Sequence, residues 1–277
     1  RSFHVTGVQT CALPISIGYS ILKKSDIFHN SQIILISDNH DINYKNCGTS
    51  EPDIQIDFYL EYLLNKNYIV MIEEIPNTKE LISLFPNSSH VNNIRNFYIN
   101  NKDNKNIIPI DIRFEIIDNH EEAYYDEQIL KNYIFKIYEF FMLEHNFFKN
   151  LSLYSQNIDN TILKTHYKIL LNKFISFIKK YNKYLEYKIK DIFYKSILIN
   201  EITKILSDIM EFYILIKLYD FLNDGNKKII IYAGLYHIDN IKKLLIKYYK
   251  YKEIDNYGIT NMNDIFSENR CIKLIPE

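Results

Sequence analysis

Two short apolar stretches decide the fold, Ile33-Ile-Leu-Ile-Ser-Asp-Asn-His40 and Ile229-Ile-Ile-Tyr-Ala-Gly-Leu-Tyr-His237. Each is a β-branched run of the kind that forms a strand buried in a parallel sheet. Each also delivers a histidine just beyond its carboxyl end, where ligands collect in open α/β sheets. The sequence therefore predicts an α/β fold with a mainly parallel sheet, flanking helices and a site at the carboxyl edge.

Two further apolar runs bring carboxylates and an arginine to the same edge. They are Tyr68-Ile-Val-Met-Ile-Glu-Glu74 and Ile107-Ile-Pro-Ile-Asp-Ile-Arg113. Because successive strand residues face opposite sides, one of Glu73 and Glu74 should face the crevice while the other caps the next segment. The four runs together are expected to gather His, Glu, Asp, Arg and His side chains around one crevice.

Arginine is rare in this chain and occurs only at positions 1, 95, 113 and 270, against a large excess of lysine. An arginine that follows a buried strand indicates a need for a planar, bidentate donor. Asp111 lies two residues before Arg113 on the same face of the strand. The pair is compatible with joint contact to a ligand and with a structural salt bridge at the sheet edge.

The two histidines have different surroundings. His237 lies at a strand-to-helix junction after Gly234, where a glycine indicates a close backbone approach or a positive φ. The amides of a helix N-terminus bind an anion or a developing oxyanion, although a partly exposed His237 that merely caps the helix fits the same pattern. His40 is flanked by Asp38 and Asp41, which can orient the imidazole, join it on a metal, or simply form a turn.

The remaining sequence predicts helices. A helix start at Ser50-Glu-Pro-Asp53 opens a crossover to the Tyr68 run, with short helices after it at 77–84 and 89–99. A long helical insertion is expected at about 118–222, because apolar residues recur there at spacings of three and four. The stretches concerned are 119–149, 160–181, 184–197 and 201–222, followed by a helix at 237–250 and a weak strand at 271–274.

Composition limits the classes of function. The 277 residues are 47% hydrophobic with a formal net charge of -1, which provides neither a basic field for nucleic acid nor a polybasic membrane patch. No apolar run is long enough to cross a bilayer, so a soluble and cytoplasmic protein is favoured. Cys47 and Cys271 form no disulfide framework and no metal-type cluster. The abundant Ile, Asn, Lys and Tyr are typical of AT-rich genomes, as in many giant DNA viruses.

The first residues have a separate origin. Val5-Thr-Gly-Val-Gln-Thr-Cys-Ala-Leu-Pro-Ile15 matches a translated sequencing-library adapter. Residues 1–15 are therefore expected to be an artefact that packs poorly, with the true N-terminus missing. Residues 16–277 are expected to form a single α/β domain interrupted by the helical insertion.

The strand ends together resemble the TIKI/TraB superfamily, which includes erythromycin-esterase-like and haem-binding ChaN-like branches. Its pattern is a GxxH motif after the first core strand, a Glu after the second, an Arg in a later strand and a second GxxH after a helical insertion. Gly234-Leu-Tyr-His237 matches the second motif, and Glu73 and Arg113 occur in the expected order. Ser37-Asp-Asn-His40 departs from the first motif, with serine in place of glycine.

The resemblance implies a hydrolase of the metal-dependent peptidase or esterase-like kind, acting on a small-molecule or peptide substrate. His40, Glu73 and His237 would hold a divalent metal or perform general acid-base chemistry. Arg113, oriented by Asp111, would bind a substrate carboxylate or stabilise an oxyanion. A metal-free version with histidine as the general base is equally compatible with the sequence.

Two other functions are compatible with the same residues. The same crevice can serve a non-catalytic protein that binds haem, a metal or a small ligand, with the aromatic insertion as its wall. Alternatively, Asn39-His40-Asp41 looks like one element of calcineurin-type metallophosphoesterases. Their later Gly-His-x-His motif is absent from this chain.

Overall fold

The structure is a computed structural model that describes residues 11–13, 16–26, 29–38, 56–76, 89–113, 127–142, 161–186, 192–223, 228–264 and 272–273. Its contacts divide the chain into two compact units. The sheet unit comprises Arg1–Ile110 and Tyr219–Glu277, and the helical unit comprises Asp111–Leu218. The helical unit covers most of the segment expected as an insertion at 118–222.

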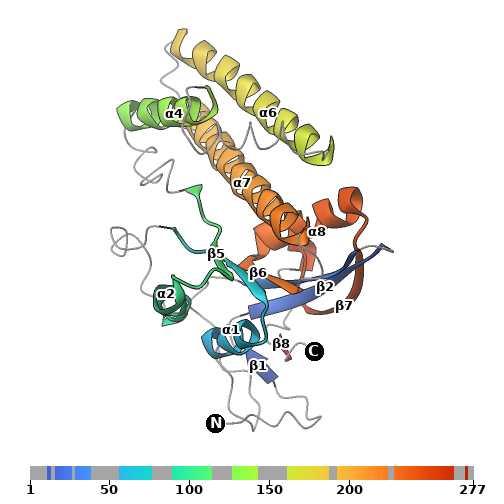
Figure 1. Cartoon of the computed structure of the whole chain (residues 1–277). Helices are drawn as coiled ribbons and strands as arrows, with labels where there is room; N and C mark the ends of the chain where they lie inside the picture. Colours follow the sequence, from blue (N-terminus) through green and yellow to red (C-terminus); the bar gives the residue numbers. More distant parts are fainter. Residues whose placement is uncertain are drawn as a thin grey trace. The chain divides into compact units, whose positions relative to one another are not determined.

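The sheet unit contains a six-stranded sheet with the order β5-β4-β6-β3-β2-β7 (Figure 1). The strands are β2 (Ser16–Asp26), β3 (His29–Asp38), β4 (Ile69–Ile72), β5 (Ile107–Pro109), β6 (Lys228–Gly234) and β7 (Lys252–Gly258). The strands β5, β4, β6 and β3 pair in parallel, whereas β2 pairs antiparallel with both β3 and β7. The α/β class and the mainly parallel sheet are therefore confirmed. A separate antiparallel pair joins β1 (Cys11–Leu13) to β8 (Ile272–Lys273).

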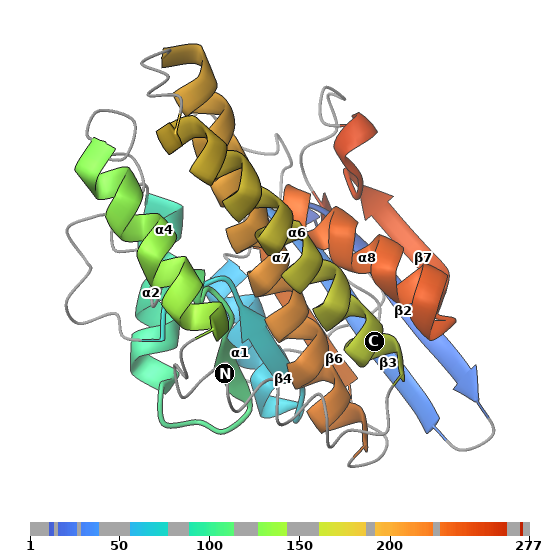
Figure 2. The same ribbon diagram turned by 90° about the horizontal axis from the view of Figure 1, so that it is seen from above.

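Three helices cover the two faces of this sheet. They are α1 (Ile56–Asn65), α2 (Ser89–Asn101) and α8 (Leu235–Tyr249). After β3 the chain passes β6 to reach β4, whereas after β6 it passes β3 and β2 to reach β7. Because crossovers are right-handed, opposite directions of travel place α1 and α8 on opposite faces. Figures 1 and 2 show this arrangement, with α1 and α2 on one face and α8 on the other.

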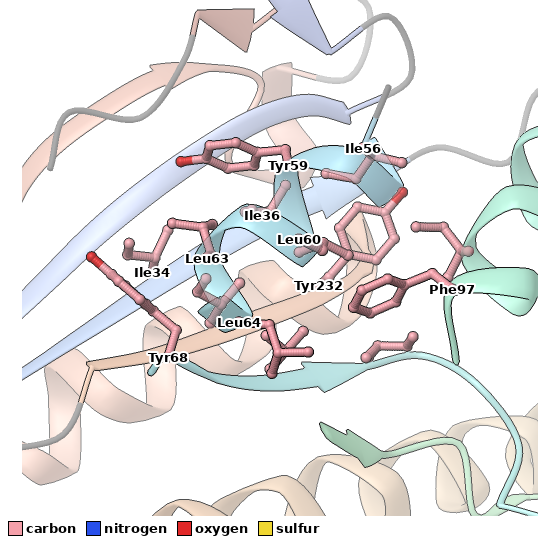
Figure 3. Close-up of a cluster of buried hydrophobic side chains, with 14 of the residues drawn as sticks. Ile34, Ile36, Ile56, Tyr59, Leu60, Leu63, Leu64, Tyr68, Phe97 and Tyr232 are labelled. Carbon is pink, nitrogen blue, oxygen red and sulfur yellow. The ribbon is translucent and has the colours of Figure 1, made fainter. Parts of the chain in front are cut away.

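The core under α1 and α2 follows from strand and helix periodicity (Figure 3). Alternate residues of the parallel strands, such as Ile34 and Ile36 of β3, face this core and are almost completely buried. Leu60 and Leu63 of α1 lie one helical turn apart and reach the same cluster. Burial of one such leucine is worth about 2 kcal/mol, so this apolar layer holds the helices on the sheet.

The sequence predicts the Ile33 run as the first strand of the sheet and predicts neither β2 nor β7. Their sequences lack a clear alternation of apolar and polar residues, and β7 is mostly exposed. Their pairing depends on close backbone approach at two glycines. A Cβ on Gly18 would lie 2.2 Å from the Ile259 carbonyl oxygen, and one on Gly258 would lie 2.3 Å from that of Ile17.

A buried lysine fastens α8 to these two strands. The Nζ atom of Lys242 donates to Ser20 Oγ at 3.3 Å, to Glu253 Oε1 at 3.3 Å and to Thr260 Oγ1 at 3.0 Å. Asp239, one turn earlier in α8, accepts the Met262 amide at 3.1 Å. These contacts explain how a polar strand such as β7 is held at the sheet edge.

The helical unit contains α4 (Glu127–Met142), α6 (Thr161–Glu186) and α7 (Ile192–Asn223), the last of which continues into the sheet unit. Lys180 pairs with Glu201 and Lys173 with Asp208, so α6 and α7 run antiparallel. The expected helices at 184–197 and 201–222 are wrong in their boundaries. The stretch 184–197 begins in α6 and ends in α7. No break separates it from the stretch 201–222, because α7 continues through the exposed Asn200.

The expected short helix at 77–84 lies outside the described residues, as do the ends of the stretch expected at 119–149.

Candidate functional site

The sheet topology creates a switch point between β3 and β6. These two neighbouring strands have connections that leave in opposite directions, one toward β4 and the other toward β7. In open α/β sheets, ligands bind at such a point, outside the carboxyl ends of the strands. The strands end there at Asp38 and Gly234, which are paired in register. Asp38 is 1% exposed, so a carboxylate is buried at this edge.

Gly234 ends β6 and is the N-cap residue of α8. Its φ of -54° and ψ of 145° lie in the ordinary extended region, so the expected alternative of a positive φ is wrong. No side chain of its own caps the helix, because glycine has none. His237 is the third residue of α8 and is 5% exposed, which contradicts the expectation of a partly exposed imidazole. Its ring lies edge-on to that of the exposed neighbour Tyr236, with the ring centroids 5.4 Å apart.

Glu73 supplies the cap that Gly234 lacks. Its Oε2 atom accepts a hydrogen bond from the Gly234 amide at 2.6 Å, and its Oε1 atom lies 3.8 Å from His237 Nε2. The carboxylate therefore sits at the positive end of the α8 dipole and beside the imidazole. The Glu73 side chain is 11% exposed, so the contact is largely shielded from water.

The neighbouring Glu74 faces the other way. Its Oε1 atom lies 3.6 Å from Arg95 Nε of α2, and the two side chains are 5% and 7% exposed. These contacts decide which of the two glutamates lies beside His237. Glu73 faces the α8 side with Gly234 and His237, whereas Glu74 is engaged in an ion pair with α2.

Asp111 and Arg113 form a bidentate pair within the helical unit. Arg113 Nε donates to Asp111 Oδ1 at 2.7 Å, and Nη2 donates to Oδ2 at 2.9 Å. The Arg113 backbone amide also donates to Asp111 Oδ1 at 3.2 Å. Asp111 thus fixes the plane of the guanidinium, whose side chain is 25% exposed.

His40 lies outside the described residues, so its expected place at the site is not described by the structure. In the parts of the chain that are described, no three His, Cys, Asp or Glu side chains are grouped so that they could hold a metal ion. Glu73 and His237 provide two donors, fewer than the three protein ligands of a typical catalytic zinc site.

Sequence reasoning did not assign a role to Arg95. The rarity of arginine in the sequence could have identified it, since this rarity applies to position 95 as much as to position 113. The local sequence does not indicate that Arg95 is buried, because it follows no strand and lies in an amphipathic helix, where charged residues are ordinarily exposed.

Comparison with known proteins returned no family model, no curated protein and no solved structure that matches this chain. Among the helices that the structure describes, none combines the length and apolarity required to cross a lipid bilayer.

Proposed function

We propose that this protein is a hydrolase, of the esterase-like or peptidase kind, with His237 as its general base and Glu73 as the carboxylate partner of that base. The observation that supports this proposal is the contact of Glu73 with both Gly234 and His237 beside the switch point. A small-molecule ester or a peptide is the proposed substrate.

The chemistry assigned to His237 is proton transfer. In this proposal its imidazole takes a proton from a water that attacks the substrate carbonyl carbon, and the Glu73 carboxylate stabilises the imidazolium that forms. The imidazolium then returns the proton to the alkoxide or amine that leaves as the C–O or C–N bond breaks. The contact of 3.8 Å is longer than a hydrogen bond, so the pair would close as charge develops. The first amides of α8 have no partner within the helix and are donors of the type that stabilises an oxyanion.

A divalent metal would need more ligands than Glu73 and His237. The two described donors do not complete a metal site, so the proposed proton transfer passes through His237 and not through a metal. His40 would be the third ligand in a metal-dependent version.

The test is a screen of the full chain against a panel of nitrophenyl esters and unstructured peptides, with a chelator and with added Mn²⁺, Zn²⁺ or Co²⁺. We expect turnover that falls on the order of a hundredfold or more in His237→Gln and Glu73→Gln. Lys173→Met, an exposed change in the helical unit, is the matched control and should retain turnover. A wild-type protein that is inactive under every condition, or variants with wild-type turnover, would refute the proposal.

The same samples address the non-catalytic alternative. Haem titration followed by absorbance would produce a Soret band in a haem-binding protein, and metal content would be measured after dialysis. A tight ligand without turnover would replace the hydrolase proposal by a binding role for the same residues.

A further inference from the structure

We propose that Arg95 is a positioning residue for Glu73. It holds the adjacent Glu74 on the opposite face of the sheet and thereby fixes the end of β4. The effect on catalysis rests on the proposed function, whereas the effect on the geometry of Glu73 can be measured without any activity.

The backbone at the end of β4 separates the two glutamates. The Glu73 amide donates to the Tyr232 carbonyl of β6 at 2.9 Å, so the ladder between β4 and β6 extends to this residue. The Glu74 amide instead donates to the Ile72 carbonyl at 2.7 Å, so the chain turns at Glu73 itself. The contacts place the two carboxylates on different sides, with Glu73 at Gly234 and His237 and Glu74 at Arg95 of α2.

On the α2 face the chain is held at two points. The buried ion pair of Glu74 with Arg95 is the first. The second is the Tyr98 hydroxyl, one turn further along α2, which donates to the Pro76 carbonyl at 3.2 Å. Burial raises the pKa of Tyr98, and the Glu74 carboxylate raises it further, as expected for a phenol beside that carboxylate. Residues 74–76 are therefore anchored on α2.

On the α8 face, Glu73 contacts Gly234 and His237. Glu73 and Glu74 share one peptide group, so a movement of the Glu74 backbone also moves Glu73. Removal of the Arg95 cation takes a positively charged partner from the buried Glu74 carboxylate, which is unfavourable. Glu74 is then expected to turn toward water and to draw the Glu73 carboxylate away from the Gly234 amide.

The chain offers a direct measurement of this movement. It has only six glycines, so labelling with ¹⁵N-glycine produces a simple amide spectrum. The Gly234 signal is assigned as the one lost in Gly234→Ala, and Glu73→Ala shows its position without the hydrogen bond to residue 73. We expect Arg95→Met to move the Gly234 signal toward that position, and Arg95→Lys, which keeps the charge, to move it less.

Two controls separate positioning from general loosening. Phe97→Leu weakens the packing of α2 without changing a charge, and it should leave the Gly234 signal in place. In a Glu74→Met background, Arg95→Met should have no further effect, because the charge through which Arg95 acts is gone. This background also keeps the test open if Arg95→Met alone fails to fold.

Three results would overturn the proposal. They are an unchanged Gly234 signal in folded Arg95→Met, an equal movement in Phe97→Leu, and an undiminished effect of Arg95→Met in the Glu74→Met background. If wild-type turnover is found, Arg95→Met should lower kcat on the order of a hundredfold with little change in KM, and Arg95→Lys should recover part of it. An inactive wild-type protein refutes the proposed function, while the glycine signals still decide the role of Arg95.

Discussion

The Gly234 amide donates a hydrogen bond of 2.6 Å to the carboxylate of Glu73, although the two residues are 161 positions apart in the sequence. The bond joins the end of β4 to the beginning of α8 and places a negative charge at the positive end of that helix. A glycine at the N-cap position has no side chain with which to cap the helix. Glu73 therefore acts as a cap supplied from another strand, and the same carboxylate lies beside His237.

Glu73 is expected to contribute to stability independently of any activity. Glu73→Ala should lower the free energy of unfolding by about 1 to 2 kcal/mol, because it removes the cap and its charge. Glu73→Gln, which keeps an acceptor, should lower it by less. Urea unfolding followed by circular dichroism measures both, with the exposed Glu61→Gln as the control. Equal stability of Glu73→Ala and the wild type would show that the carboxylate does not cap α8.

His237 should be more costly to truncate than its place at a helix junction indicates. The sequence is compatible with a partly exposed imidazole that caps the helix, and loss of a helix cap costs about 1 kcal/mol. Because the side chain is 5% exposed, His237→Ala leaves a cavity, and we expect a loss of about 2 to 4 kcal/mol. His237→Gln, which fills more of the space, should lose less stability yet still lose turnover. A His237→Ala protein as stable as the wild type would contradict the buried position.

Gly18 and Gly258 should tolerate no larger residue. Either Gly→Ala change forces a Cβ to within 2.3 Å of a backbone carbonyl oxygen, and Gly258 also has a φ of +73°. We expect each to destabilise the protein by more than about 2 kcal/mol, since backbone rather than a flexible side chain must move. Denaturant midpoints test this, with Asn256→Ala as an exposed control on β7. Near wild-type stability of both variants would argue against the pairing of β2 with β7.

Tyr19 should make the fold sensitive to alkaline pH. Burial, and then the Asp255 carboxylate to which its hydroxyl donates, raise the pKa of Tyr19 from 10.0 to about 12. The unfolded chain loses this proton first, so the stabilisation is complete below about pH 10 and is lost as the pH rises toward 12. Between about pH 9 and about pH 11.5, the wild type should lose more stability than Tyr19→Phe. Parallel losses in urea unfolding, with Tyr236→Phe as the exposed control, would contradict the raised pKa.

The ion pairs between α6 and α7 should be weak despite their short distances. Lys173 and Asp208 lie 2.6 Å apart, but their side chains are 53% and 27% exposed. We expect a coupling energy below about 1 kcal/mol in a double-mutant cycle of Lys173→Met and Asp208→Asn, reduced further by salt. A coupling of several kcal/mol that persists at high salt would mean that the pair is buried in solution.

The sequence by itself determined the local elements of this protein. The continuous apolar runs at Ile33, Tyr68 and Ile229 predicted strands, and the spacing of three and four within 160–181 predicted a helix that the structure contains. The periods of two and 3.6 residues are local properties, so they can be read from neighbouring positions. The same patterns placed Glu73 just after its strand and His237 at a strand-to-helix junction, which is where the structure has them, after β4 and in the first turn of α8.

Only the tertiary structure decided which of these residues meet. The strand order β5-β4-β6-β3-β2-β7, the switch point between β3 and β6, and the inclusion of the polar strand β7 depend on pairing over long separations. No local pattern reports such pairing, because it is selected by backbone approach at Gly18 and Gly258 and by the contacts of Lys242. Which of Glu73 and Glu74 lies beside His237 likewise depends on two helices that pack on opposite faces of the sheet. Arg95 in α2 holds one glutamate and the N-terminus of α8 holds the other, so the physical reason lies in the packing of the sheet between them.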